Sequence, residues 1–100
     1  MKPKIYIVRS KIWLYPGMAG WYFVNVGKKQ SREIQKRYGR ASRGFGSLPV
    51  QVVVGKTSWK TSIFPDRKSE TYLLPLKTEV RRKENIQRGK TITFSIEIRI

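Results

Sequence analysis

Two basic side chains and one tryptophan have the residue types and spacing of a site for an anionic ligand. Lys77 and Arg81 lie four residues apart, so a helix in this region would place both on one flank. Because neighbouring cations repel each other, they could hold a carboxylate or a phosphate between them, or they could pair with Glu84 or Glu97. Trp59 could line a pocket or stack on the bases of a nucleic acid, although burial preferences favour a core position for it. The sequence therefore predicts ligand-binding roles for Lys77, Arg81 and Trp59.

A longer basic segment lies before the middle of the chain. Residues 28–43 contain seven basic residues and a single acid, Glu33. Lysine and arginine side chains in such segments contact the phosphates of nucleic acids. The glycines of the loop at residues 44–47 could add backbone N–H groups as an anion nest, or could only serve turns. Within the basic segment we predict contacts to backbone phosphates from Arg32, Lys36, Arg40 and Arg43.

The composition offers few groups for catalysis or metal binding. The 100 residues include no Cys and no His, which removes disulfides, the imidazole base and most zinc, haem and iron–sulfur ligation. The six acids are scattered, and the closest loop pair, Asp66 and Glu70, has basic neighbours. A serine activated by a lysine is an open alternative, with the candidates Ser47 or Ser62 and Lys60 or Lys77. We predict no cofactor, no metal site and no catalytic residue, and we lean toward a protein that is not an enzyme.

The net charge is far from zero. The chain has 22 Lys and Arg residues against 6 Asp and Glu residues, a formal charge of +16. Such a charge attracts polyanions, and counterion release supplies much of the affinity for nucleic acid, although it could also only maintain solubility. No apolar run approaches the ~18 residues that span a bilayer. We therefore expect a soluble cytoplasmic protein without membrane contacts.

The apolar pattern predicts one mainly β domain over residues 1–100. The first strand changes parity around residues 9–11, which indicates a bulge. Ser31 is the expected N-cap of a first helix, Leu76 begins a second, and Trp21 is expected in the core. About six strands with two short helices favour a small six-stranded barrel, since closure removes exposed edges. We expect strands at residues 4–15, 21–26, 50–54, 57–64, 72–74 and 91–100.

The segment at residues 52–57 ends like a phosphate-binding P-loop, but two features exclude that motif. Val50 occupies the position where the motif needs a glycine, and a strand follows where the motif needs a helix. The pattern instead predicts a tight hairpin with a positive φ at Gly55, whose second strand ends at Pro65.

Five stretches in order across the chain resemble one known family, the domain of unknown function 1905. They are residues 20–24, 46–50, 59–65, 72–77 and 80–83, which read GWYFV, GSLPV, WKTSIFP, YLLPLK and VRRK. The family consists of small, mainly bacterial and archaeal barrel proteins, some fused to a YdeI/OmpD-associated segment linked with bacteriocin protection. The resemblance implies a six-stranded β-barrel with two short helices. It implies no established activity and no catalytic residues.

Three hypotheses for function follow. The leading one is a non-enzymatic binding module for an anionic partner, with nucleic acid favoured by the charge. The alternative is a small-molecule pocket protein, conceivably an enzyme, that holds an anionic ligand with Lys77 and Arg81 at the barrel mouth. The third is an interaction module whose charge only maintains solubility. The sequence leaves the oligomeric state open.

Overall fold

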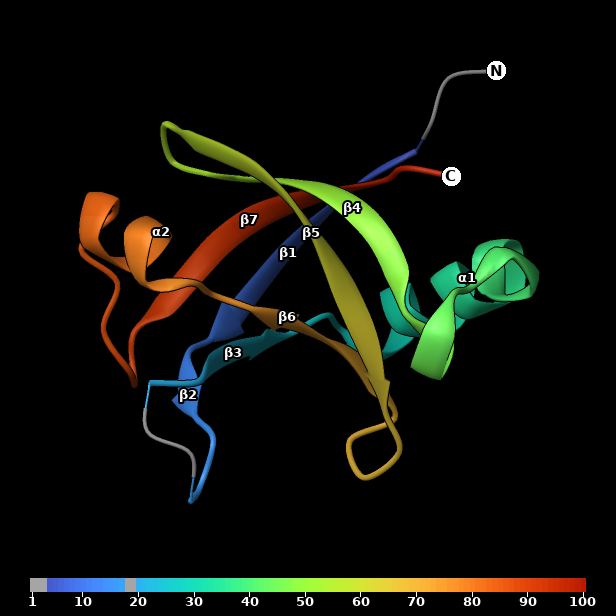
Figure 1. Cartoon of the computed structure of the whole chain (residues 1–100), viewed down its shortest axis with the longest axis horizontal. Coiled ribbons are helices and arrows are strands. Elements are labelled where there is room, and N and C mark those ends of the chain that lie inside the picture. Colours follow the sequence, from blue (N-terminus) through green and yellow to red (C-terminus); the bar gives the residue numbers. More distant parts are fainter. Residues whose placement is uncertain (1–3, 18–19) are drawn as a thin grey trace.

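Seven antiparallel strands form one sheet that curves into a nearly closed barrel in the computed structural model, which describes residues 4–17 and 20–100 (Figure 1). The strands are β1 (Ile5–Lys11), β2 (Trp13–Leu14), β3 (Tyr22–Asn25), β4 (Leu48–Val54), β5 (Thr57–Asp66), β6 (Thr71–Pro75) and β7 (Thr91–Ile98). The helices are α1 (Lys28–Tyr38) and α2 (Thr78–Lys83), and two 3₁₀ turns follow α1, η1 (Gly39–Ala41) and η2 (Gly44–Gly46). The predicted mainly β barrel with two short helices is confirmed.

The strand order explains how the barrel closes. The order is β1-β7-β4-β5-β6-β3-β2, so the two edge strands are consecutive parts of one chain segment. They are separated at Ile12, whose N–H donates to the Lys90 carbonyl and whose carbonyl accepts from Gly89 N–H, both at 2.8 Å. The first strand is therefore interrupted as expected, although at Ile12 and not within residues 9–11. This division makes seven strands where six were predicted.

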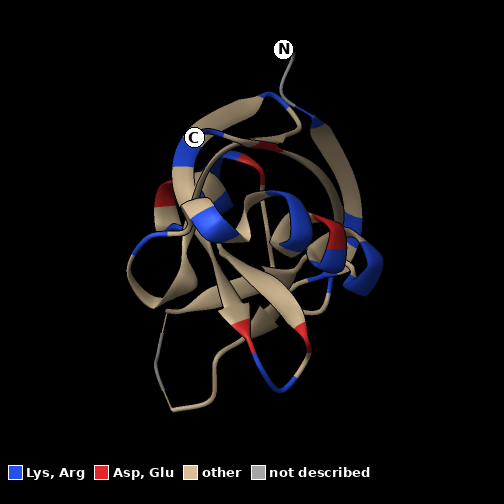
Figure 2. Cartoon of the chain, turned by 90° about the vertical axis from the view of Figure 1, so that its right-hand side faces the viewer, with Lys and Arg blue, Asp and Glu red and all other residues tan. Residues whose placement is uncertain are grey.

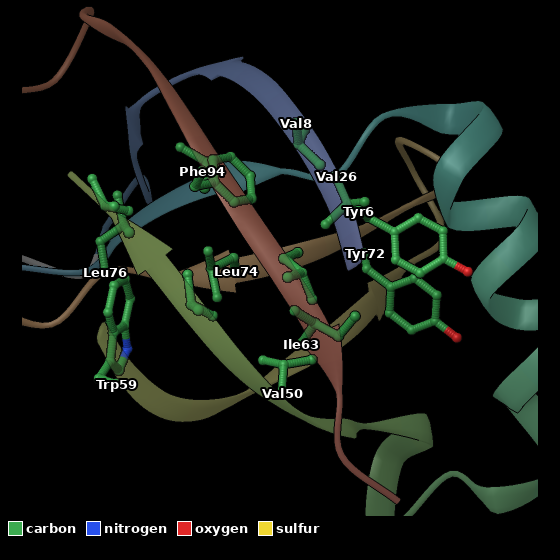
Figure 3. Packing of buried hydrophobic residues seen from close by; sticks show 14 of the residues in the cluster. Tyr6, Val8, Val26, Val50, Trp59, Ile63, Tyr72, Leu74, Leu76 and Phe94 are labelled. Atoms are coloured by element: carbon green, nitrogen blue, oxygen red, sulfur yellow. The ribbon is translucent and has the colours of Figure 1, made fainter. Parts of the chain in front are cut away.

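The core lies inside the barrel and follows the period-two pattern of the strands. On β4 the buried side chains are at alternate positions, as they are on β7, because successive residues of a strand point to opposite faces (Figure 3). One prediction about the core is wrong. Trp21 is 50% exposed, because it precedes β3 and stacks from outside on Phe23, with the ring centroids 6.0 Å apart.

Helix α1 covers one end of the barrel and buries Ile34 (Figure 1). The helix begins three residues before the predicted N-cap, Ser31, with Gly27 at the N-cap position. Ser31 is instead buried inside the helix, where its hydroxyl donates to the Val26 carbonyl at 3.1 Å and accepts from Tyr72 N–H at 3.0 Å. The hydroxyl thus joins α1 to β6, since a buried hydroxyl must find partners.

Helix α2 lies at the opposite end of the molecule (Figure 1). It begins at Thr78 rather than at Leu76, but Leu76 and Val80 are both buried, as expected. The tight hairpin is also confirmed, with φ of 56° at Gly55, whereas β5 continues through Pro65 to Asp66. No helix within residues 4–17 and 20–100 is long and apolar enough to cross a membrane.

Candidate functional sites on a basic helix and in an aromatic groove

The predicted phosphate contacts lie together at the end of the molecule that carries α1. Arg32 and Lys36 are one turn apart on the face of α1 that points away from Ile34, and both are exposed. Arg40 belongs to η1, which follows directly, and Arg43 is the residue before η2. Figure 2 faces this end and shows Lys and Arg on the exposed turns. We call the exposed basic residues of this end, Lys28, Lys29, Arg32, Lys36, Arg37, Arg40 and Arg43, the basic end.

The single acid of this segment does not neutralise the basic end. Glu33 accepts a hydrogen bond from Lys4 on the segment before β1, at 2.7 Å, and this contact holds the pKa of the Glu33 carboxyl below its usual range. Within the described residues, no ion pair or side-chain hydrogen bond involves any of the seven basic side chains. Their charge is therefore available to an anion in solution.

A fully exposed aromatic residue lies next to these cations. Phe45 is 97% exposed and has φ of 61°, a conformation that costs a non-glycine residue about 1–2 kcal/mol. Its loop is closed by hydrogen bonds from Arg43 N–H to the Ser47 carbonyl at 2.8 Å and from Gly46 N–H back to the Arg43 carbonyl at 2.9 Å. The loop thus presents the ring to solvent. A strained backbone at such an exposed position supports the hypothesis of a functional role for Phe45.

A groove of about 720 Å³ lies between β5 and the segment that joins β6 to α2. Its volume is in the range of small-ligand sites. None of the described residues that line it is acidic. Aromatic side chains form much of the wall and two lysines lie with them, the set being Trp21, Tyr22, Trp59, Phe64, Lys60 and Lys77.

The groove exists because the sheet opens at a proline. β5 pairs with β6 only at three positions, from Asp66↔Thr71 to Phe64↔Leu73. The next residue of β6 whose peptide groups face β5 is Pro75. Because proline has no N–H to donate, the ladder ends there. Leu76 N–H bonds instead to the Tyr22 carbonyl on β3 at 2.8 Å. β6 therefore stays paired with β3 and β5 stays paired with β4, and the groove lies between β5 and the end of β6.

Lys77 and Trp59 both line this groove, and their roles in ligand binding stay predictions. Lys77 is exposed and precedes the first turn of α2. Trp59 is only 8% exposed and packs inside the barrel near Leu76, so it forms the inner wall (Figure 3). Its place in the hydrophobic core agrees with the burial expected for it and argues against stacking on a nucleic acid at the basic end, which lies at the other end of the barrel.

Arg81 is placed differently, behind the groove wall. Its Nε donates to the Leu76 carbonyl at 3.0 Å, and its Nη2 donates to Thr78 Oγ1 at 2.9 Å and to the Gly20 carbonyl at 3.3 Å. The guanidinium also stacks on the Tyr22 ring, 4.0 Å from the centroid. The alternative of a pair with Glu84 or Glu97 is not realised. Glu84 accepts a hydrogen bond from Thr57 Oγ1 at 2.5 Å, and Glu97 pairs with Arg99 at 3.6 Å. Arg81 therefore ties α2 to β3 and positions the wall.

The catalytic candidates are divided between the groove and two loops. Asp66 accepts hydrogen bonds from the backbone N–H and the hydroxyl of Ser69, which closes the loop before β6. Ser62 and Lys60 both line the groove, whereas Ser47 belongs to the loop of Phe45. No group of three His, Cys, Asp or Glu side chains in the described part of the chain is arranged to hold a metal ion.

Sequence reasoning missed Phe45, and it named Lys60 only as a possible partner of a nucleophilic serine. A phenylalanine between two glycines is the available signal for Phe45, because such a loop has little around it to bury a ring. Lys60 alternates with Trp59 and Thr61 on β5, which places it on the outer face, but nothing in the sequence indicates that the sheet opens beside it.

Comparison with known proteins identifies a family for this chain. None of the curated proteins matches the sequence. Residues 9–96 match the family described as "Domain of unknown function (DUF1905)". This range covers both helices and all strands except the start of β1 and the end of β7. The chain therefore belongs to the DUF1905 family.

Proposed function

We propose that the protein binds nucleic acid through the basic end. The observation that carries this proposal is the absence of any acidic partner for the seven basic side chains within the described residues. A helix face whose cations repel each other and stay solvated gains free energy when phosphates approach, mainly through release of condensed counterions. The contacts to backbone phosphates are made by Arg32, Lys36, Arg40 and Arg43.

Phe45 adds an aromatic surface to these contacts. Every base has a π-face, and stacking of one base on an aromatic side chain is worth about 1–3 kcal/mol by alanine substitution. The ring follows Arg43 by two residues and is almost fully exposed. A single strand has unstacked bases and a duplex does not, so we expect single-stranded oligonucleotides to bind more tightly.

The test is fluorescence anisotropy with a labelled single strand and with its duplex, titrated at several salt concentrations. Four phosphate contacts predict a log–log slope of about −3 for the single strand. Replacing all four contact residues with glutamine should remove most of the binding and most of the slope. The matched control removes four exposed cations elsewhere, at Lys56, Arg82, Arg88 and Lys90.

The Phe45 contribution has its own readout. Phe45→Asn tolerates the left-handed backbone and should lower single-strand affinity by about tenfold or more without changing the salt slope, while Phe45→Tyr should keep the affinity. Equal losses of affinity in the quadruple glutamine variant and in its matched control would mean that only the total charge matters. An affinity independent of salt would mean that no phosphate is contacted. Either result would refute binding at the basic end.

The aromatic groove supports a second candidate function. Its volume, its aromatic wall and its lysines suit an anionic ligand of small-molecule size, with Lys77 and Trp59 in contact and Arg81 holding the wall. Titration of the protein with benzoate, followed by tryptophan fluorescence, tests this function. Loss of the response in Lys77→Gln, with no change in Lys56→Gln, is the expected result.

A further inference from the structure

We propose that the groove takes an extended acidic peptide segment, which adds to β5 as a further strand. This proposal rests on the second candidate function, that the groove is a ligand site, and names the class of ligand. It is independent of nucleic-acid binding at the basic end. Three features support it: the free edge of β5, the direction of its peptide groups and the charges beside it.

The edge of β5 that faces away from β4 has no strand partner along much of its length. β4 pairs with β5 from Val54↔Thr57 to Leu48↔Ile63. β6 pairs with β5 only from Phe64 onward. Residues 57–62 therefore have a neighbouring strand on one side only among the described residues, and residues 59–62 of this stretch line the groove. An unpaired edge is a template for another strand, and proteins either cover it or use it.

The peptide groups of Lys60 and Ser62 point toward the groove. Arg99 N–H donates to the Pro49 carbonyl at 2.9 Å, so the peptide groups of Pro49 face away from β5. Pro49 is paired with Ser62, and in an antiparallel ladder both members of such a pair face outward. Lys60, two residues earlier, has the same orientation. Each of these two residues thus offers one N–H and one C=O to a strand in the groove.

The side chains around this edge select the sequence of the added strand. Side chains of a strand alternate between its two faces, so every second residue of the peptide would face Trp59 and Leu76 on the inner wall. The residues between them would face Lys60 and Lys77, which lie on opposite sides of the groove with no acid in its described lining. A segment that alternates apolar and acidic residues satisfies both faces.

The row of backbone groups favours a peptide over a free small molecule. A compact anion could meet the lysines and the aromatic wall, but it would leave the N–H and C=O groups of β5 to water. A peptide strand bonds to these groups at the spacing of the ladder and gains main-chain affinity from them. Pro75 on the opposite side of the groove has no N–H to donate, so only β5 offers the added strand both donors and acceptors.

Amide hydrogen exchange by NMR tests the geometry first, in the protein without ligand. The amides of Lys60 and Ser62 should exchange fast, whereas those of Trp59 and Thr61, which face β4, should be protected. The probes are then the pentapeptide acetyl-Val-Glu-Val-Glu-Val-amide and its counterpart with Lys in place of Glu. The acidic peptide should slow exchange at Lys60 and Ser62, and the basic peptide should not bind.

Two variants separate charge from strand addition. Lys60→Glu combined with Lys77→Glu should weaken the acidic peptide by about tenfold and should let the basic peptide bind. The matched control reverses Lys56 and Lys90, and should change neither affinity by more than about twofold. Pro75→Val restores a donor opposite Ser62, so it should extend the β5–β6 ladder, protect the Ser62 amide and abolish peptide binding while both lysines remain.

Three results would overturn the proposal. The first is protection of the Lys60 and Ser62 amides in the unliganded protein. The second is a tryptophan response to benzoate with no binding of either peptide, which would leave the groove as a small-ligand site only. The third is peptide binding that protects amides outside β5. Absence of any response to benzoate and to both peptides would refute the groove as a ligand site as well.

Discussion

At the scale of single residues, the same type of side chain has opposite roles at the two ends of this molecule. Arg81 uses its guanidinium within the chain, where it bonds to two backbone carbonyls and one hydroxyl and stacks on Tyr22. Arg32 and Arg40 make no ion pair or side-chain hydrogen bond with a described residue, and both are exposed. Fork geometry and stacking distinguish an arginine from a lysine, so position in the fold and not charge alone decides what each arginine does.

Arg81→Ala should destabilise the fold. The substitution removes the stacking on Tyr22 and leaves the partly buried Leu76 carbonyl without its hydrogen-bond donor. It should lower the free energy of unfolding by about 1–3 kcal/mol. Urea unfolding followed by circular dichroism measures the change. Arg81→Lys should recover less than half of the loss, because an ammonium cannot bond to several acceptors in the plane of a fork. Full recovery by lysine would show that only the charge at position 81 is needed.

The hydroxyl of Tyr6 predicts a pH dependence of stability. Tyr6 is buried, its hydroxyl points toward α1, and it has no hydrogen-bond partner in bonding geometry among the described residues (Figure 3). Burial raises its pKa above the usual value, and the nearby Glu33 carboxylate raises it further. Burial likewise raises the pKa of Tyr72. The folded state thus favours both neutral hydroxyls.

We therefore expect the contribution of Tyr6 to be full below about pH 10, where an unfolded tyrosine titrates, and to fall as the pH rises above that value. Urea unfolding at intervals from pH 8 to 11 measures the decline. Tyr6→Phe should lose less stability over this range than the unsubstituted protein. Lysine titration affects both proteins alike, so it cancels in the difference between their free energies of unfolding. At pH 7 the variant should be equally stable or slightly more stable, because it removes an unpaired buried hydroxyl. A parallel decline in both proteins would contradict the prediction.

At the scale of elements, α1 packs firmly on the barrel although the basic side chains on its exposed face repel one another. Ile34 and Ser31 anchor the helix to the barrel. Basic residues at a spacing of four, such as Arg32 and Lys36, repel each other by a few tenths of a kcal/mol for each pair. Tertiary packing outweighs this repulsion, since most of the stability of a short helix comes from its buried face. A surface that costs stability in this way is consistent with selection for a partner.

Arg32→Glu should therefore move stability and binding in opposite directions. A glutamate four residues before Lys36 replaces a repulsion with an attraction in the favoured orientation, and should raise the free energy of unfolding by about 0.5–1 kcal/mol. It should also weaken oligonucleotide binding more than Arg32→Gln does. Urea unfolding and anisotropy on the same samples measure both effects. A variant that is less stable and binds equally well would contradict the roles of both residues.

The opening between β5 and β6 is also a property of elements. It depends on Pro75 occurring at a position that faces β5, while Leu76 N–H bonds to Tyr22 on β3. The sequence predicts that a strand stops near this proline. The direction in which the chain leaves, along β3 and away from β5, depends on the pairing of three strands that are distant in the sequence.

At the scale of the whole molecule, the charge of +16 has few compensating ion pairs among the described residues. The three ion pairs within the described residues all involve exposed or half-exposed groups, and such pairs contribute little. Self-repulsion of the excess cations therefore dominates the electrostatics of the folded state.

Added salt should consequently stabilise the protein while weakening its binding to nucleic acid. Between 20 and 500 mM NaCl the screening length falls from above 20 Å to below 5 Å, which suppresses repulsion between exposed cations. We expect the thermal midpoint to rise by several degrees, as measured by circular dichroism. The quadruple glutamine variant of the basic end should show a smaller rise. A midpoint that falls with salt would mean that ion pairs outweigh the repulsion.

The sequence by itself determined the class of fold, the alternating core positions of β4 and β7, the tight turn at Gly55 and the excess of positive charge. These features are local, because side-chain period, turn chemistry and composition act over a few residues. Tertiary structure alone decided the closure of the barrel at Ile12, the exposure of Trp21 and Phe45, and the separation of Lys77 in the groove from Arg81 behind its wall. These outcomes depend on which strands pair across long stretches of chain, and a spacing of four residues does not carry that information.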